Sequence, residues 1–357
     1  MADKLNFSAS SPVIPKDVIS RITSNINNFY SNGFSALELN YKNPVFIDLM
    51  NDTVSLFKEL LDLNDDMEVL FINGGASIHF AMVPLNFASK NETVTMINSD
   101  LWTNNAVIEA EKYTNVNQIN LMNNHGPLPK ITKKDIDENS KYLFMCTNNT
   151  SSGSKFNKDK IPKIGDIPLI ADMTSNLLSE SYNINEFALS FASCAKNMGT
   201  SGMSVVIIKR NMLEKETDKN IMKILSYKDY FYSDNSFTTP NTFSLYIIYE
   251  MLKYLKEFGG VKEMEKVNIE KSNLLYDFID ESEFYGNDIV KEDRSVTSLV
   301  FNVKNTDDFI ECAKKSDIIN ISKSIKNAVR VGLYNGVTLC DVKKLIDFMY
   351  KYEKTNN

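Results

Sequence analysis

The sequence has 357 residues, of which 43% are hydrophobic and 24% are charged, the balance of a globular protein. This length predicts one large domain and a second, smaller one. The net charge of −7 argues against a nucleic-acid or membrane-surface partner, because both need a basic face. No apolar stretch resembles a signal peptide or approaches the roughly 20 residues that span a bilayer, and the four cysteines show no pairing pattern. We therefore expect a cytoplasmic protein and, with two histidines, no metal site.

The first half of the chain alternates between helical and strand-like patterns. Amphipathic helices are expected at residues 18–30 and 44–63. A buried strand at 67–72 is followed by the turn Asn73-Gly-Gly-Ala-Ser and another helix. A helix is expected at 103–113, and further short strands are expected at 93–97, 142–146, 168–171, 188–191 and 204–208. This alternation predicts an α/β fold with a mostly parallel sheet flanked by helices.

The last third of the chain has a different pattern. A helix at 242–258 ends at Gly259-Gly260, and another covers 261–279. Beyond residue 293, strand-like segments alternate with short helices, at 298–303, 307–315, 328–333 and 339–351. We therefore expect a large domain at 16–258 and a small α+β domain at 259–357, joined by the N-terminal segment 1–15.

Two residues stand out as candidates for catalysis. Leu169-Ile-Ala-Asp172 places a carboxylate at the carboxyl end of a buried strand, where open α/β sheets bind ligands. Lys196 follows the next strand, between small residues and the glycine-rich run Asn197-Met-Gly-Thr-Ser-Gly. Alone, the first is more often a capping residue and the second a surface lysine. Together they match the two anchors of pyridoxal-phosphate (PLP) chemistry, an acid for the pyridine nitrogen and a Schiff-base lysine.

Two further features fit a flat, phosphorylated cofactor. Gly74-Gly75-Ala76-Ser77, between a strand and a helix, offers main-chain N–H groups to an anion. Trp102, the single tryptophan, is expected in a loop, where its indole could stack on a ring, although core packing is the commoner role.

At this point the sequence resembles the phosphoserine aminotransferases, which are class-V, fold-type-I PLP enzymes. The resemblance runs from about Asn6 to near the C-terminus, through ordered matching stretches: Asn6-Phe-Ser-Ala, residues 69–84, Thr147-Asn-Asn-Thr, Ala171-Asp-Met-Thr-Ser-Asn, Ala195-Lys-Asn-Met-Gly, Thr239-Pro-Asn-Thr-Phe-Ser and Arg330-Val-Gly-Leu-Tyr-Asn. It implies a mostly parallel seven-stranded sheet, a smaller C-terminal α+β domain, and a homodimer with active sites at the subunit interface.

The resemblance also implies roles for individual residues. Lys196 would bind PLP and shuttle protons, and Asp172 would pair with the pyridine nitrogen. Arg330 would grip the α-carboxylate of the substrate, a task that suits a planar guanidinium. The remaining cofactor contacts would be stacking by Trp102, a hydrogen bond from Thr150 to the phenolic oxygen, and a phosphate site formed by Ala76, Ser77 and, from the other subunit, Thr239 with its neighbour Thr238.

The sequence departs from the family where the substrate phosphate binds. The family usually has Ser-His-Arg where this chain has Asn40-Tyr41-Lys42. It usually has His-Arg ahead of a glycine pair where residues 322–328 read Ser-Lys-Ser-Ile-Lys-Asn-Ala, without glycine. Lysine keeps the charge of arginine but loses its fork geometry. Tyr41, Lys42 and Lys323 are thus candidates for an altered anion site.

Three functions remain open at this level. The leading one is transamination between an acidic amino acid and a 2-oxo acid, with phosphoserine and 2-oxoglutarate as the family pair, in serine biosynthesis. The second is a divergent enzyme that uses another amino acid, or that eliminates or replaces a group at Cβ, in a specialised pathway. The third is a PLP-binding protein without catalysis, which the joint presence of Lys196, Asp172 and Arg330 disfavours.

Overall fold

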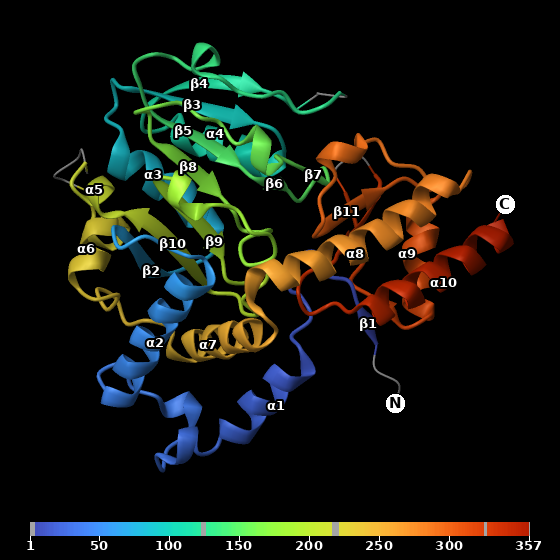
Figure 1. The fold of residues 1–357 in the computed structure, drawn as a ribbon, viewed down its shortest axis with the longest axis horizontal. Coiled ribbons are helices and arrows are strands. Elements are labelled where there is room, and N and C mark those ends of the chain that lie inside the picture. Colours follow the sequence, from blue (N-terminus) through green and yellow to red (C-terminus); the bar gives the residue numbers. More distant parts are fainter. Residues whose placement is uncertain (1–3, 123–125, 216–220, 325–326, 357) are drawn as a thin grey trace.

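The computed structural model describes residues 4–122, 126–215, 221–324 and 327–356, and the chain forms two lobes (Figure 1). The larger lobe is built on one seven-stranded sheet of order β2-β10-β9-β8-β5-β3-β4. All neighbours are parallel except β10, which is antiparallel to β2 and β9. The predicted α/β fold with a mostly parallel sheet is therefore confirmed. The strands are β2 (Met67–Asn73), β3 (Thr93–Asn98), β4 (Asn115–Asn120), β5 (Ser140–Cys146), β8 (Leu169–Asp172), β9 (Leu189–Ser193) and β10 (Met203–Lys209).

Helices cover both faces of this sheet because its strands are apolar on both sides. Along β2, Val69 and Phe71 enter one core, whereas Leu70 and Ile72 enter the other. A strand buried on both faces is typical of parallel sheets. The first core is closed by α2 (Pro44–Leu60) and α7 (Thr242–Glu257), with α1 (Lys16–Asn25) packed on α7; the second is closed by α3 (His79–Phe87), α4 (Leu101–Ala110), α5 (Arg210–Leu213) and α6 (Tyr227–Tyr232).

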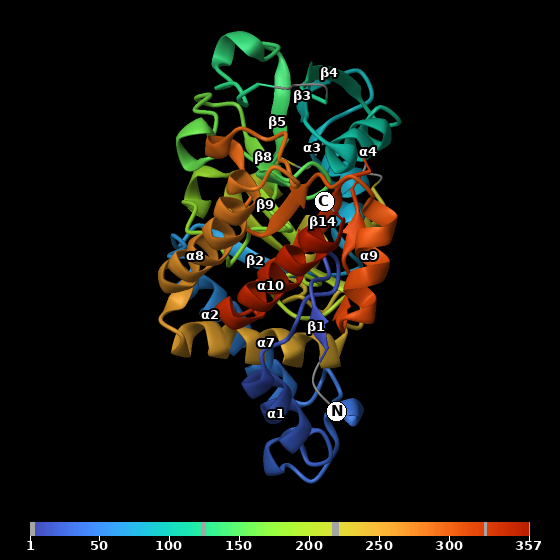
Figure 2. The same ribbon diagram turned by 90° about the vertical axis from the view of Figure 1, so that its right-hand side faces the viewer.

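The smaller lobe contains α8 (Gly260–Glu281), α9 (Thr306–Lys315) and α10 (Leu339–Asn356) around a three-stranded antiparallel sheet. Figure 2 views this lobe from its outer side. Its sheet has the order β11 (Ser298–Phe301), β14 (Val329–Gly332), β13 (Ser322–Lys323). The N-terminus joins it, because β1 (Leu5–Asn6) pairs with β12 (Ile318–Ile319) and Phe7 lies in the core of the lobe.

Helix α8 connects the two lobes and packs on both. Val261 and Met264, near its start, belong to the core of the large lobe, whereas Leu275 and Ile279, near its end, belong to that of the small lobe. We propose residues 16–258 and 259–357 as the two domains, joined by residues 1–15. In the described part of the chain, no helix is both long and apolar enough to cross a membrane.

Candidate active site

A cavity of about 250 Å³ lies at the carboxyl ends of β5, β8 and β9, where they face the small lobe. Ligands of open α/β sheets bind at this end of the strands. Three parts of the chain far apart in sequence close the cavity: the large lobe, the N-terminal segment and the small lobe. Its walls are formed by Ala9, Ser10, Ala76, Ser77, Phe80, Trp102, Cys146, Asn148, Thr150, Asp172, Thr174, Ser175, Ser193, Ala195, Lys196 and Arg330.

Asp172 is the last residue of β8, and its carboxylate faces the cavity from a buried position. Its Oδ1 accepts a hydrogen bond of 2.9 Å from the main-chain N–H of Thr174. Burial raises the pKa of Asp172 to about 6, because the hydrogen bond from Thr174 only partly offsets the loss of water. No ion pair within the described residues involves this carboxylate. A cationic ligand group in the cavity would therefore meet a buried carboxylate that has no ion-pair partner among the described residues.

Lys196 lies on the loop after β9, and its amino group donates hydrogen bonds to the carbonyl oxygen of Ala9 and, over 2.8 Å, to the hydroxyl of Tyr334. The lysine is therefore held between the N-terminal segment and the small lobe. Parallel pairing of β8 with β9 brings the two loops that carry Asp172 and Lys196 to one edge of the sheet.

The glycine turn after β2 opens towards the same cavity. Gly74 has a φ of +121°, which a residue with a side chain rarely adopts, and its N–H donates to the carbonyl of Gly202. No carbonyl of the described residues accepts from the N–H groups of Ala76 or Ser77. These N–H groups and the Ser77 hydroxyl together form a donor set suited to a phosphate.

Buried His79 fixes the start of the helix that follows this turn. Its Nδ1 lies 2.8 Å from the hydroxyl of Tyr227, and its Nε2 lies 2.8 Å from that of Ser204 on β10. Burial lowers the pKa of His79 to about 3, so the ring is neutral and serves as one donor and one acceptor.

The expectation that Trp102 lies in a loop is wrong, because it is the second residue of α4. Asp100 caps this helix by accepting from the N–H of Trp102, which starts the helix two residues earlier than the apolar pattern indicates. The other oxygen of Asp100 accepts from the N–H and hydroxyl of Ser151, next to Thr150. Trp102 as a whole is 42% exposed, and it lines the cavity.

Arg330 enters the cavity from the small lobe, on β14. It is half-buried, and its Nε donates to the hydroxyl of Ser322 over 3.3 Å. Arg330 forms no ion pair with a carboxylate of the described residues. Its guanidinium is therefore free to receive a carboxylate from a ligand.

Five residues expected from the sequence lie outside the cavity within one chain. Lys323 is exposed and pairs with Asp307, with a distance of 2.6 Å from Nζ to Oδ1. The other four are Tyr41, Lys42, Thr238 and Thr239. The side-chain amide of Asn73, in the large lobe, donates hydrogen bonds to Thr238 and Thr239. Residues 325–326, within the altered anion motif, lie outside the described residues.

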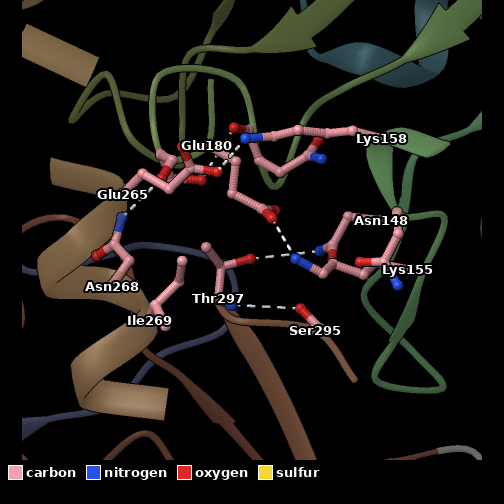
Figure 3. A network of polar contacts seen from close by, with 12 residues as sticks. Asn148, Lys155, Lys158, Glu180, Glu265, Asn268, Ile269, Ser295 and Thr297 are labelled. Carbon is pink, nitrogen blue, oxygen red and sulfur yellow. Dashed lines mark hydrogen bonds and ion pairs between the residues drawn. The ribbon is translucent and has the colours of Figure 1, made fainter. Parts of the chain in front are cut away.

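Sequence reasoning gave no role to Asn148, which lines the cavity and joins the lobes (Figure 3). Its amide nitrogen donates to the hydroxyls of Ser175, over 2.6 Å, and of Thr297, in the small lobe, over 3.3 Å. Both hydroxyls donate their own hydrogens to carbonyl oxygens, so the orientation of the amide is set. The buried Oδ1 of Asn148 has no partner among the described residues.

An ion pair beside this contact holds the neighbouring loops together. Lys155 pairs with Glu180, and their side chains are only 12% and 2% exposed; Lys158 pairs with Glu265 on α8 (Figure 3). These pairs join the segment after β5 to the segment after β8 and to α8, the helix that leads into the small lobe.

The fold and this site define a protein of the aminotransferase type. The chain belongs to the class-V aminotransferase family, whose model matches residues 4–345. It is 32% identical to the phosphoserine aminotransferase of Bacillus cereus over 98% of each chain. Its structure is similar to that of phosphoserine aminotransferase from Bacillus circulans subsp. alkalophilus, with a TM-score of 0.95, 28% identity and full coverage of both chains. It is also similar to PLP-bound phosphoserine aminotransferase from Trichomonas vaginalis, with a TM-score of 0.91, 25% identity, and coverage of 97% of this chain and 99% of that one.

Proposed function

We propose that this chain is a PLP-dependent aminotransferase that acts on phosphoserine and 2-oxoglutarate. The observation that carries the proposal is the meeting of Lys196, Asp172 and Arg330 in one cavity, in a chain whose relatives are phosphoserine aminotransferases along 98% of their length.

The residues of the cavity fit PLP group by group. Asp172 is buried without an ion pair and would bind the pyridinium nitrogen. The N–H groups of Ala76 and Ser77 would bind the phosphate, Trp102 would stack on the ring, and Thr150 would donate to its phenolic oxygen.

The residues of the chain divide the chemistry among them. When bound, PLP supplies an electron sink for the electron pair left at the substrate Cα. Arg330 holds the α-carboxylate and so orients the Cα–H bond. Lys196 holds PLP between turnovers, and its Nζ takes the proton from Cα and returns it. Asp172 would keep the ring nitrogen protonated.

A second candidate function follows from the position of Lys323. The ion pair with Asp307 turns this lysine away from the cavity, although the family uses its neighbourhood for the substrate phosphate. An acidic amino acid with a carboxylate in place of the phosphate is therefore the alternative substrate.

Half-reactions with single amino acids separate these functions. The purified protein loaded with PLP is mixed with phosphoserine, glutamate, aspartate or alanine, and its absorbance is followed as PLP converts to the amine form. Phosphoserine and glutamate should both convert it. If only glutamate and aspartate do so, the phosphoserine assignment is wrong; if no amino acid does, transamination is wrong.

We further propose that the active enzyme is a cytoplasmic homodimer that serves serine biosynthesis. Support comes from residues that the family assigns to the site but that lie outside the cavity of one chain: Tyr41, Lys42, Thr238 and Thr239. A partner subunit would supply them. Sedimentation should give a dimer, and a mixture of inactive Lys196→Ala with weakened Thr239→Asp chains should regain activity through hybrid sites. A monomer with full activity would contradict the dimer.

A further inference from the structure

We propose that Tyr334 is a positioning residue: its hydroxyl and the carbonyl oxygen of Ala9 form a binding site for the free amino group of Lys196. This site would hold the lysine at the stage of the reaction in which it carries no cofactor. The inference rests on the proposed function, in which Lys196 alternates between a bound and a free form.

The geometry is a closed set of hydrogen bonds around one buried hydroxyl. Tyr334 has no exposed surface, and its oxygen lies 2.8 Å from Lys196 Nζ, 3.1 Å from the carbonyl oxygen of Ala9 and 3.2 Å from the hydroxyl of Ser298. A carbonyl oxygen only accepts, so the hydroxyl hydrogen of Tyr334 points to Ala9. The two acceptor positions of Tyr334 then receive hydrogens from Lys196 and Ser298.

Counting hydrogens on Nζ shows which form of Lys196 this site selects. The lysine donates to both Tyr334 and Ala9. Attachment joins Nζ to the aldehyde carbon of PLP with loss of water, which leaves Nζ one hydrogen at most. When a substrate amino group displaces the lysine, the substrate nitrogen would take over the bond to that carbon, and hydrogens from the substrate amino group would bring Nζ back to two. Both contacts can therefore form only after release, so they stabilise the released lysine.

A buried lysine on α8 fixes the loop that carries Tyr334. Lys271 on α8 is fully buried, and its ammonium donates to the carbonyl oxygens of Leu333, Tyr334 and Val337 over 2.9–3.3 Å. Burial lowers the pKa of Lys271 to about 7, and the negative charge of Asp341 opposes this shift.

A second set of contacts ties this loop to the lysine loop itself. The N–H of Asn335 donates to the side chain of Asn197, the residue after Lys196, and its amide nitrogen donates to the carbonyl of Leu178. Asn268 on α8 donates to Asn335 in turn. Contacts with α8 and with the loop of Lys196 therefore fix the position of the loop that carries Tyr334.

A purely structural role for this hydroxyl predicts the opposite effect on the cofactor. If it only ties the N-terminal segment to the small lobe, its loss loosens the cavity and PLP is bound less firmly. If it stabilises the released lysine, its loss favours the attached form. The sign of one equilibrium therefore separates the two roles.

The test uses the PLP-loaded protein and an amino acid that displaces Lys196 but cannot react further. An α-methyl amino acid such as 2-methylglutamate has no hydrogen at Cα, so the reaction stops once the lysine is released. Absorbance gives the concentration at half-displacement for wild type, Tyr334→Phe and a matched control, Tyr285→Phe. Tyr285 is a buried tyrosine of the small lobe whose hydroxyl donates to the carbonyl of Met349.

In Tyr334→Phe the half-displacement concentration should rise about three- to tenfold, because the released amine loses one of its two hydrogen bonds, and the attached form cannot make both. It should stay within about twofold in Tyr285→Phe and in Ser298→Ala, which keeps the Tyr334 hydroxyl. An unchanged or lower value in Tyr334→Phe, with a normal thermal midpoint, would overturn the proposal. If wild type shows no PLP linked to Lys196 after borohydride reduction, the proposed function itself fails.

Discussion

Replacement of Asp172 by Asn should stabilise the PLP-free protein while weakening its hold on PLP. The carboxylate is buried at the end of β8, and its pKa is raised from 3.8 to about 6. The folded state therefore binds this proton more tightly than the unfolded state does. Stability falls as the pH rises from about 4 to 6, and above that range the full cost of burying the charge is present.

The size of this effect follows from the two pKa values. Their difference corresponds to about 3 kcal/mol of lost stability above pH 6. Asparagine has no charge to bury and can still accept the hydrogen bond from Thr174. At pH 7.5 the PLP-free Asp172→Asn protein should thus be more stable by up to about 3 kcal/mol, and near pH 4 it should match wild type.

Unfolding by urea, followed by circular dichroism on protein stripped of PLP, measures this difference. A matched control is Asp347→Asn, an exposed aspartate on α10, whose midpoint should not change at either pH. Titration with PLP should give weaker binding to Asp172→Asn than to wild type. A variant that is less stable than wild type at pH 7.5 would refute the reasoning, because the carboxylate would then be stabilised by groups of the protein alone.

Three further changes have defined outcomes. Lys196→Ala should keep the fold but lower the transamination rate by roughly 10²–10⁴-fold, and mass spectrometry after borohydride reduction should find no PLP adduct. Lys155→Met should lower stability by about 3–5 kcal/mol in thermal unfolding, because its buried carboxylate partner is left unpaired; a midpoint equal to wild type would count against the pair. Gly332→Ala places a Cβ 2.3 Å from the carbonyl oxygen of Ser8, so it should cost about 1–3 kcal/mol and reduce PLP affinity, whereas Gly286→Ala, with ordinary contacts, should do neither.

The sheet was predictable where apolar residues run continuously. Strands β2, β5 and β10 are buried on both faces, so their sequences carry a clear signal. Strand β4 gave none, because Asn115–Asn120 lies at the sheet edge and is polar and mostly accessible. The two-residue strand β1 is formed by a partner distant in the sequence, which no local pattern reveals.

The candidate site was predictable to the extent that it depends on neighbouring strands. Asp172 and Lys196 follow β8 and β9, and parallel pairing brings such positions together. Tyr334 gave no signal of its own, because its contact with Lys196 depends on how the small lobe and the N-terminal segment pack. The ion pair of Lys323 with Asp307 was equally hidden, since charge alone does not tell which partner a lysine chooses.

The N-terminal segment has a consequence for how the protein is made. Leu5 pairs with Ile318, and the N–H of Gly332 donates to the carbonyl of Phe7. On a ribosome, residues 5–10 emerge long before these partners and can meet them only after residues 318–332 have been synthesised. Contacts of such long sequence separation form slowly. The part of the cavity wall that Ala9 forms should therefore assemble last. A chain released before residue 334 would lack this part of the wall, even if its central sheet were complete.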